Sequence, residues 1–330
     1  QAVALHIYPA SITQLGDVTY FLGRHNGEKY VGCAGEGEIE GNDAGTVQGL
    51  PVIVGPTSHE NAHVIRRLLS WTSPERIGLD TSVGLGDRLG LATPGHIRAV
   101  VGKDVRPVLA QQSIREMTRT QRTPEQVMDA DTWGVLQEGY RGGFGADADH
   151  LQEPRDVDAT VAAGFRMFTI DPGAHVENAA DEYHIDDLAD YYASLDFETL
   201  EVSAEDLSGA YLDRTFDLPG GASVRFDEIT FLRAAVKYGN AIAHTVQMFR
   251  HLASAADDFE VEVSVDETES PTSPEEHYFF AHELNRLGVE WVSLAPRYVG
   301  RFEKGVDYIG DIQQFRDELR AHVRVMEACG

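Results

Sequence analysis

Side chains that could bind a metal ion or transfer protons recur directly after short apolar segments of this sequence. Carboxylates held close together raise one another's pKa, and a bound divalent cation removes that penalty. Carboxylate and imidazole donors suit Zn, Mn, Ni or Co. The polar residues at these segment ends are Gln111, Gln112, Ser113, Asp147, Asp149, His150, Thr169, Asp171, Asp266, Glu267, Thr268, Glu269 and Arg297.

The predicted metal ligands are His150, Asp171 and Glu267, and Asp149 and His175 compete for the same role. Any one of these residues could instead cap a helix or form a salt bridge. The hypothesis rests on the group, because several carboxylates and an imidazole held together need a cation.

The elements that would position these groups alternate along the chain from about residue 76. Strand-like segments followed by helical patterns are typical of a parallel α/β fold. Polar groups at several strand ends favour a (β/α) barrel over a doubly wound open sheet, because all strands of a barrel end at the active-site face. The predicted strands are Gly78 to Val83, Pro107 to Gln112, Gly143 to Asp149, Phe165 to Asp171, Phe259 to Asp266 and Trp291 to Ala295.

Helix signals fall between these strands. Thr123 as N-cap before Pro124 begins one helix, and Ser273 before Pro274 begins another that ends at Gly288,. Further helices are predicted over 94–101 and 228–254, and residues 184–226 are predicted to form an acidic, loop-rich insertion.

Two domains are predicted. Residues 1–75 form a small N-terminal α/β segment, with strands at 18–22, 29–33 and 50–54 and a helix over 60–69,. Residues 76–330 form the catalytic barrel. About six β/α units are recognisable where a barrel has about eight. The chain ends just after a helix, so we predict a barrel truncated at its C-terminus.

The composition excludes several classes of partner. The chain has 54 Asp and Glu against 27 Lys and Arg, a net charge of −27, which repels nucleic acid and anionic membranes,. No apolar run reaches the roughly 20 residues of a membrane span, and no signal peptide is recognisable. With only Cys33 and Cys329, a reducing, cytoplasmic location is expected,. The acidity reflects either a biased genome or a high-salt cytoplasm.

Two short motifs point to other chemistry, but neither has the context that this chemistry requires. The HExxH match at 59–63 begins a helix in the N-terminal segment, and no third zinc ligand follows on a second helix,. The loop from Gly84 to Gly90 resembles a dinucleotide-binding motif, but its last glycine falls one position late and the next helix starts only near Pro94,. We instead predict a turn that presents Asp87 and Arg88 to the substrate.

Several longer runs of this sequence carry a more specific signal than these short motifs. They are GLGDRLGLATPGHIRAV (84–100), LAQQSIRE (109–116), DTWGVLQEGY (131–140), GFGADADHL (143–151), FTIDPGAHV (168–176), EVSVDETESPTSPEEH (262–277) and WVSLAPRYVGRFEKGVDYIGD (291–311). These runs resemble the tagaturonate epimerase family. The resemblance extends over nearly the whole chain and is densest at 84–176 and 259–311.

The resemblance implies a metal-dependent enzyme of hexuronate catabolism that interconverts D-tagaturonate and D-fructuronate on a (β/α) barrel. The expected partner is therefore a small sugar acid. Members of the family continue with a strand that carries a His-Ser-Gly-Ser-Asp-Lys run, which this sequence lacks.

The substrate implied by the resemblance restricts the mechanism. The carbon that inverts lies β to the ketone, so simple enolisation cannot reach it. In a retro-aldol route, a base removes the hydroxyl proton on that carbon, the carbon–carbon bond breaks, and the aldehyde rotates before rebonding, while the metal polarises the ketone. The other route, oxidation and reduction by a bound nicotinamide, has no credible dinucleotide site here.

Roles follow for individual residues. Asp149 or Asp266 is the predicted general base, with Glu269 as a substitute. Arg297 is expected to bind the substrate carboxylate bidentately, and Arg301 and Lys304 could share that task. Lys304 could instead pair with Asp307, and His244, which lies mid-helix in an apolar run, is predicted to pack in the core. The other residues predicted to bind the substrate are Gln111, Gln112, Ser113, Thr169 and His175. His175 could instead have a purely structural role beside the turn at Pro172.

Two other functions are compatible with the same residues. A metal-dependent aldolase of the class II type would release its fragments, and a sugar-acid-binding protein would not turn over. The sequence leaves the oligomeric state open, and a homo-oligomer is compatible with it.

Overall fold

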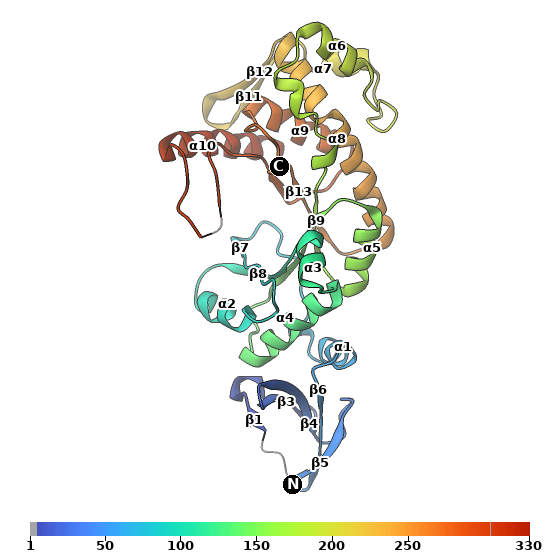
Figure 1. The fold of residues 1–330 in the computed structure, drawn as a ribbon, viewed down its shortest axis with the longest axis vertical. Coiled ribbons are helices and arrows are strands. Elements are labelled where there is room, and N and C mark those ends of the chain that lie inside the picture. The colour runs from blue at the N-terminus through green and yellow to red at the C-terminus, as the bar shows by residue number, and fades with distance from the viewer. Residues whose placement is uncertain (1–4, 304) are drawn as a thin grey trace. The chain divides into compact units, whose positions relative to one another are not determined.

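The computed structural model describes residues 5–303 and 305–330, and these form two compact units. One unit comprises Gln1–Leu151 and Arg155–Phe168, and the other comprises Gln152–Pro154 and Thr169–Gly330. Most of their helices and strands are labelled in Figure 1. These two units do not test the domain boundary predicted near residue 75, which stays a prediction. None of the helices in the described ranges is long and apolar enough to cross a membrane.

The first unit begins with an antiparallel sheet. Its strands are β1 (His6–Ile7), β2 (Thr13–Leu15), β3 (Val18–His25), β4 (Glu28–Ala34), β5 (Asn42–Val47) and β6 (Leu50–Pro56), in the order β1-β3-β4-β6-β5 with β2 beside β3. Alternation places Tyr20 and Leu22 opposite Cys33 and Val31, and all four side chains are buried,. The strands predicted at 18–22, 29–33 and 50–54 are confirmed.

Helix α1 (His59–Leu68) follows this sheet and begins at the Ser58 cap. Its Ala62 and Ile65 join the buried core of the sheet, together with Trp133 and Leu136 of α4 (Pro124–Glu138). The predicted Thr123 cap of α4 is confirmed as a full capping box with Gln126,. This core therefore fixes the antiparallel sheet against α4.

Three parallel strands follow in the same unit: β7 (Ser82–Gly84), β8 (Arg106–Gln111) and β9 (Gly145–Leu151). Strand β10 (Met167–Ile170) comes next, and the boundary between the units runs through it. Helices α2 (Thr93–Val100), α3 (Ile114–Thr120), α4 and α5 (Pro154–Ala163) alternate with these strands. The alternating strands and helices predicted from the sequence are confirmed here.

In the second unit, β13 (Glu260–Ser264) pairs in parallel with β14 (Ser293–Ala295). Helix α8 (Glu228–Ala255) precedes β13, α9 (Pro274–Arg286) connects it to β14, and α10 (Ile312–Cys329) follows. The Ser273 cap of α9 forms a capping box with Glu276, as its start signals predict. Gly288 lies just beyond this helix at φ 73°, a backbone conformation that favours glycine,.

The segment over 184–226 is more regular than predicted. It contains α6 (Ile185–Ala193), α7 (Ala204–Tyr211) and a hairpin of β11 (Arg214–Leu218) and β12 (Ala222–Phe226). The prediction of a loop-rich insertion was wrong because buried aromatic side chains outweigh its acidic composition. Tyr211 packs its ring 4.9 Å from that of Phe279 and 5.2 Å from that of Phe226,.

A parallel, curled α/β sheet is thus present, but a closed barrel is not confirmed. Among residues 5–303 and 305–330, β7 pairs only with β8, and β14 pairs only with β13.

Candidate functional site

The ends of β8 and β9 bring two predicted polar positions together in the first unit. Gln111 and Asp147 occupy paired positions in the parallel ladder, and Gln111 Nε2 donates to Asp147 Oδ2 at 3.4 Å. Asp149 and His150 follow on β9, with 3.7 Å between Asp149 Oδ1 and His150 Nε2. His150 has a φ of 55°, in the left-handed region that a non-glycine residue rarely adopts,.

The loop after β7 is held by the carboxylate of Asp87. This side chain, 9% exposed, accepts hydrogen bonds at 2.5–3.2 Å from the backbone N–H groups of residues 89, 90, 92 and 93. Burial alone would raise its pKa, but the N–H groups favour the charged form and lower the pKa below its usual range,. Arg88 forms an ion pair with Glu116. The observed contacts of Asp87 organise the loop, and its role toward a substrate stays a prediction.

Gln112 and Ser113 also have well-defined structural partners. Gln112 is fully buried, accepts a hydrogen bond from Arg122 Nη1 at 2.7 Å and donates to Thr120 Oγ1 at 3.1 Å. Ser113 is the N-cap of α3 and accepts from the backbone N–H of Glu116. These contacts position the start of α3 just after β8.

In the second unit, Asp171 follows β10 directly. Its Oδ1 accepts from the backbone N–H of Gly173 at 2.8 Å, and its Oδ2 accepts from Gln152 Nε2 at 2.8 Å. The side chain is 7% exposed, and Thr169, two residues earlier, is fully buried. These hydrogen bonds fix the orientation of the Asp171 carboxylate.

The loop between β13 and α9, residues 265–273, carries three predicted carboxylates. Asp266, Glu267 and Glu269 are all exposed, and Asp266 Oδ1 accepts from Ser264 Oγ at 2.7 Å. Arg297 follows β14 and contacts this loop: its Nη1 donates a hydrogen bond to the Thr268 carbonyl at 2.6 Å. One guanidinium and three carboxylates therefore lie on adjacent strand ends of one unit.

The remaining predicted positions lie further along the chain. Arg301 is exposed, and its backbone pairs with that of Ile309. Lys304 lies outside the described residues. Its predicted role at the site stays a prediction.

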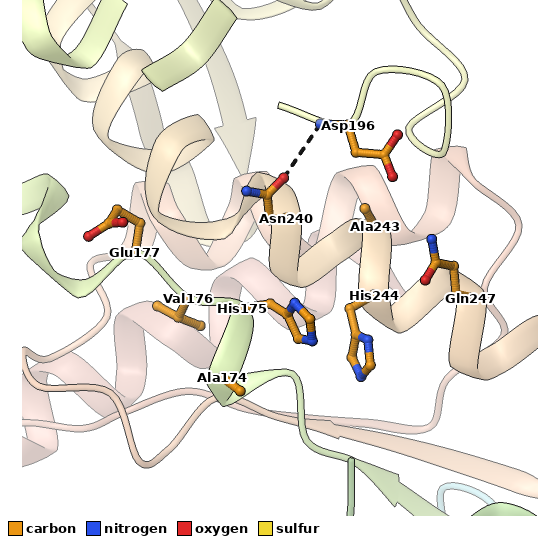
Figure 2. A pocket seen from close by; sticks show the side chains of 9 residues that line it. All are labelled: Ala174, His175, Val176, Glu177, Asp196, Asn240, Ala243, His244 and Gln247. Carbon is orange, nitrogen blue, oxygen red and sulfur yellow. Dashed lines mark hydrogen bonds between the residues drawn. The ribbon is translucent and has the colours of Figure 1, made fainter. Parts of the chain in front are cut away.

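A cavity of about 410 Å³ lies between the turn after β10 and α8. Figure 2 shows His175 and His244 side by side among the residues that line it, and their rings stack with centroids 4.0 Å apart. Burial, followed by the neighbouring His175, lowers the pKa of His244. Asn240 and Gln247 of α8 also line the cavity, so α8 contributes three polar side chains to it together with His244. The sequence predicts His175 at the substrate site but predicts that His244 only packs in the core. The spacing of four residues between Asn240 and His244, which puts both on one face of α8, was the available sequence signal that His244 shares a polar surface.

A buried cation was missed altogether. Lys237 of α8 is fully buried and forms ion pairs with Asp181 at 2.9 Å and Glu276 at 3.0 Å. Its place in an otherwise apolar helical run was the sequence signal. Buried lysines are rare unless they are paired.

The predicted metal ligands, His150, Asp171 and Glu267, offer one imidazole and two carboxylates. An imidazole and two carboxylates are a donor set that Zn, Mn, Ni or Co accepts. Ligating carboxylates are commonly oriented by further hydrogen bonds, as Asp171 is by Gly173 and Gln152,. Within the described part of the chain, no group of three or more His, Cys, Asp or Glu side chains is arranged as a preformed metal site.

Comparison with known proteins places these residues in a family. The model of the tagaturonate epimerase family matches residues 8–330. The chain belongs to this family. A Tagaturonate/fructuronate epimerase of Thermotoga maritima is 40% identical over 322 residues, which cover 97% of this chain and 65% of that protein.

Solved structures of the family have the same fold. The native crystal structure of the fructuronate-tagaturonate epimerase from Cohnella laeviribosi is 36% identical, with a TM-score of 0.91 over 99% of this chain and 66% of that one. A structure of the same enzyme complexed with one glycerol gives a TM-score of 0.90 at the same coverage. The chain spans about two-thirds of the length of these relatives, all of which are named epimerases.

Proposed function

We propose that this member of the tagaturonate epimerase family interconverts D-tagaturonate and D-fructuronate with the help of a divalent metal ion. The observation that carries the proposal is the family match over residues 8–330, together with 40% identity to a Tagaturonate/fructuronate epimerase over 97% of the chain. An enzyme of this kind is an isomerase, and its substrate is a small sugar acid.

The metal ion is proposed to be bound by His150, Asp171 and Glu267, with Zn, Mn, Ni or Co as candidates. When bound, it would supply a Lewis acid for the ketone oxygen of the substrate. The support for this set is its chemistry and the hydrogen-bonded orientation of the Asp171 carboxylate,.

The side chains of the protein would then carry out a retro-aldol reaction. The general base is the carboxylate of Asp149 or Asp266, with Glu269 as a substitute. This carboxylate removes the proton of the hydroxyl group on the carbon that inverts. The electrons of the O–H bond form the aldehyde, and those of the broken carbon–carbon bond remain on the ketone fragment. After the aldehyde rotates, the bond re-forms on its other face and the carboxylate returns the proton.

Arg297 is proposed to bind the carboxylate of the sugar acid. A guanidinium has five N–H donors, and the hydrogen bond from Nη1 to Thr268 fixes its plane while other donors can form a bidentate pair,. Arg301 and Lys304 could assist in this role. Amide and hydroxyl groups of the other predicted residues, among them Gln111, would bind the sugar hydroxyls.

The test is incubation of the protein with D-tagaturonate after chelation and metal add-back, followed by NMR. We expect D-fructuronate to appear only when metal is restored, and Glu267→Gln to abolish its formation. Glu290→Gln, which changes an exposed carboxylate away from the 265–273 loop, is the matched control and should retain activity. Smaller carbonyl products would instead indicate an aldolase, and tight binding without conversion would indicate a binding protein.

A further inference from the structure

Lys237 is a fully buried cation whose partners come from three separate segments of the second unit. Its ammonium group contacts Asp181 Oδ2 at 2.9 Å, Ser270 Oγ at 2.9 Å and Glu276 Oε1 at 3.0 Å. An ammonium group has three N–H donors, so these contacts use all of them. A buried charge is tolerated only when it is paired and hydrogen-bonded in this way.

Ser270 connects this ion cluster to the 265–273 loop. Its hydroxyl donates to Asp181 Oδ2 at 2.5 Å and accepts from Lys237, so the loop is attached to η4 (Asn178–Asp181) and to α8 at the same point. Thr268 Oγ1 in turn donates to the Ser270 carbonyl at 3.0 Å. The position of Ser270 therefore determines the path of the neighbouring residues.

Further hydrogen bonds hold backbone N–H groups of the loop. Glu276, which binds Lys237 through Oε1, accepts from the backbone N–H of Ser273 through Oε2 at 2.7 Å. The Glu269 N–H donates to Asn178 Oδ1 at 2.9 Å, and the Thr272 N–H donates to the Arg297 carbonyl at 2.8 Å. Three loop amides are thus held by side chains or backbone that lie outside the loop.

We propose that Lys237 is a positioning residue that holds the 265–273 loop, and with it Asp266, Glu267 and Glu269, in the conformation needed for turnover. This inference rests on the proposed epimerase function. A misplacement of about 1 Å in a reacting group can lower the rate of an enzyme by about 100-fold. Lys237 does not touch the substrate in this account and acts only through the loop.

A matched control comes from another buried polar network in the same unit. The Tyr211 hydroxyl donates to Glu283 Oε1 at 2.7 Å, and Glu283 Oε2 also binds Arg286. The hydrogen bonds of this network join Tyr211, His282, Glu283, Arg286 and the Leu200 carbonyl, all of which lie outside the 265–273 loop. Tyr211→Phe therefore removes a buried hydrogen bond of the same unit without altering the loop anchors.

The experiment compares Lys237→Met, Ser270→Ala and Tyr211→Phe by steady-state kinetics and amide hydrogen exchange. We expect Lys237→Met to lower kcat about 10- to 100-fold with a smaller change in KM, and to speed exchange of the Glu269, Thr272 and Ser273 amides. Ser270→Ala, which removes only the link to the loop, should show the same exchange pattern more weakly. Tyr211→Phe should lower the melting temperature but leave kcat and these amides unchanged.

Normal kcat and normal loop exchange in Ser270→Ala and in folded Lys237→Met would overturn the proposal. If Lys237→Met does not fold, Ser270→Ala decides by the same two readouts. Absence of epimerase activity in the parent protein would contradict the proposed function alone, because the exchange comparison would still report whether Lys237 holds the loop.

Discussion

Asp131 is buried in the first unit, and the titration of its carboxyl group predicts how the free energy of unfolding changes with pH. The side chain is 2% exposed within α4 and accepts a hydrogen bond from Thr93 Oγ1. Burial raises its pKa from 3.8 to about 7, against the smaller opposing effect of the Thr93 hydrogen bond,. The folded protein therefore keeps a proton on Asp131 at pH values at which the unfolded chain has released it.

The sign of the pH dependence follows from this difference. The contribution of Asp131 to stability is fully present below about pH 3.8 and is lost as pH rises toward 7,. Between pH 5 and 8 the loss amounts to about 2.5 kcal/mol. Asp131→Asn has the shape of the protonated carboxyl and no titration, so the free energy of unfolding of this variant should lack that loss.

The assay is urea unfolding of the parent protein and Asp131→Asn at several pH values from 5 to 8. We expect the stability advantage of the variant over the parent protein to grow by about 2.5 kcal/mol between pH 5 and pH 8,. Asp129→Asn is the control, because it removes the carboxylate charge that pairs with Arg66 at 2.9 Å and should lower stability across the range,. Parallel curves for the parent protein and Asp131→Asn would refute the reasoning.

Three further predictions concern a turn, a buried histidine pair and substrate binding. Gly139→Ala should lower the free energy of unfolding by more than about 1 kcal/mol, because φ at Gly139 is 59° and an added Cβ would lie 2.3 Å from a backbone atom,. Gly164→Ala is the control: φ is 93° there but the space is open, so only backbone strain should lower its stability,. Urea unfolding of the two variants compares these effects. Burial, followed by the neighbouring His322, lowers the pKa of His277 from 6.5 to about 3, so its neutral form contributes stability above pH 6.5 that is lost on acidification toward 3,. Replacement of His277 by Phe should flatten this acid-side loss in a melting-temperature series, and an unchanged slope would contradict it. Arg297→Met should raise KM for the sugar acid more than it lowers kcat, whereas an unchanged KM would exclude carboxylate binding by this residue.

The strand and helix pattern was largely accessible from the sequence because its signals are local. Ser273, Pro274 and Glu276 specify the start of α9 within four positions, and the structure has the full capping box there,. Strand β5 was missed because its residues, Asn42–Val47, are all exposed and include a glycine, so no alternation of buried and exposed side chains marks it,.

The candidate site was accessible only in part, because residue types do not reveal which atoms are already engaged. The carboxylate of Asp87, for example, accepts hydrogen bonds from four backbone N–H groups between Leu89 and Thr93, and its predicted role toward a substrate stays a prediction. The partners of Lys237 are 33, 39 and 56 positions away, and the ring that stacks on His175 lies on another element. Such contacts depend on tertiary packing, and no spacing rule in the sequence encodes them.

Locating the metal ion tests the proposed site directly. Anomalous diffraction from crystals of the protein loaded with Zn or Mn would identify its ligands without reference to activity. We expect a single strong peak bonded to the His150 imidazole and to the carboxylates of Asp171 and Glu267. A peak bound by other side chains, or metal-loaded protein with none of these three residues as a ligand, would contradict it.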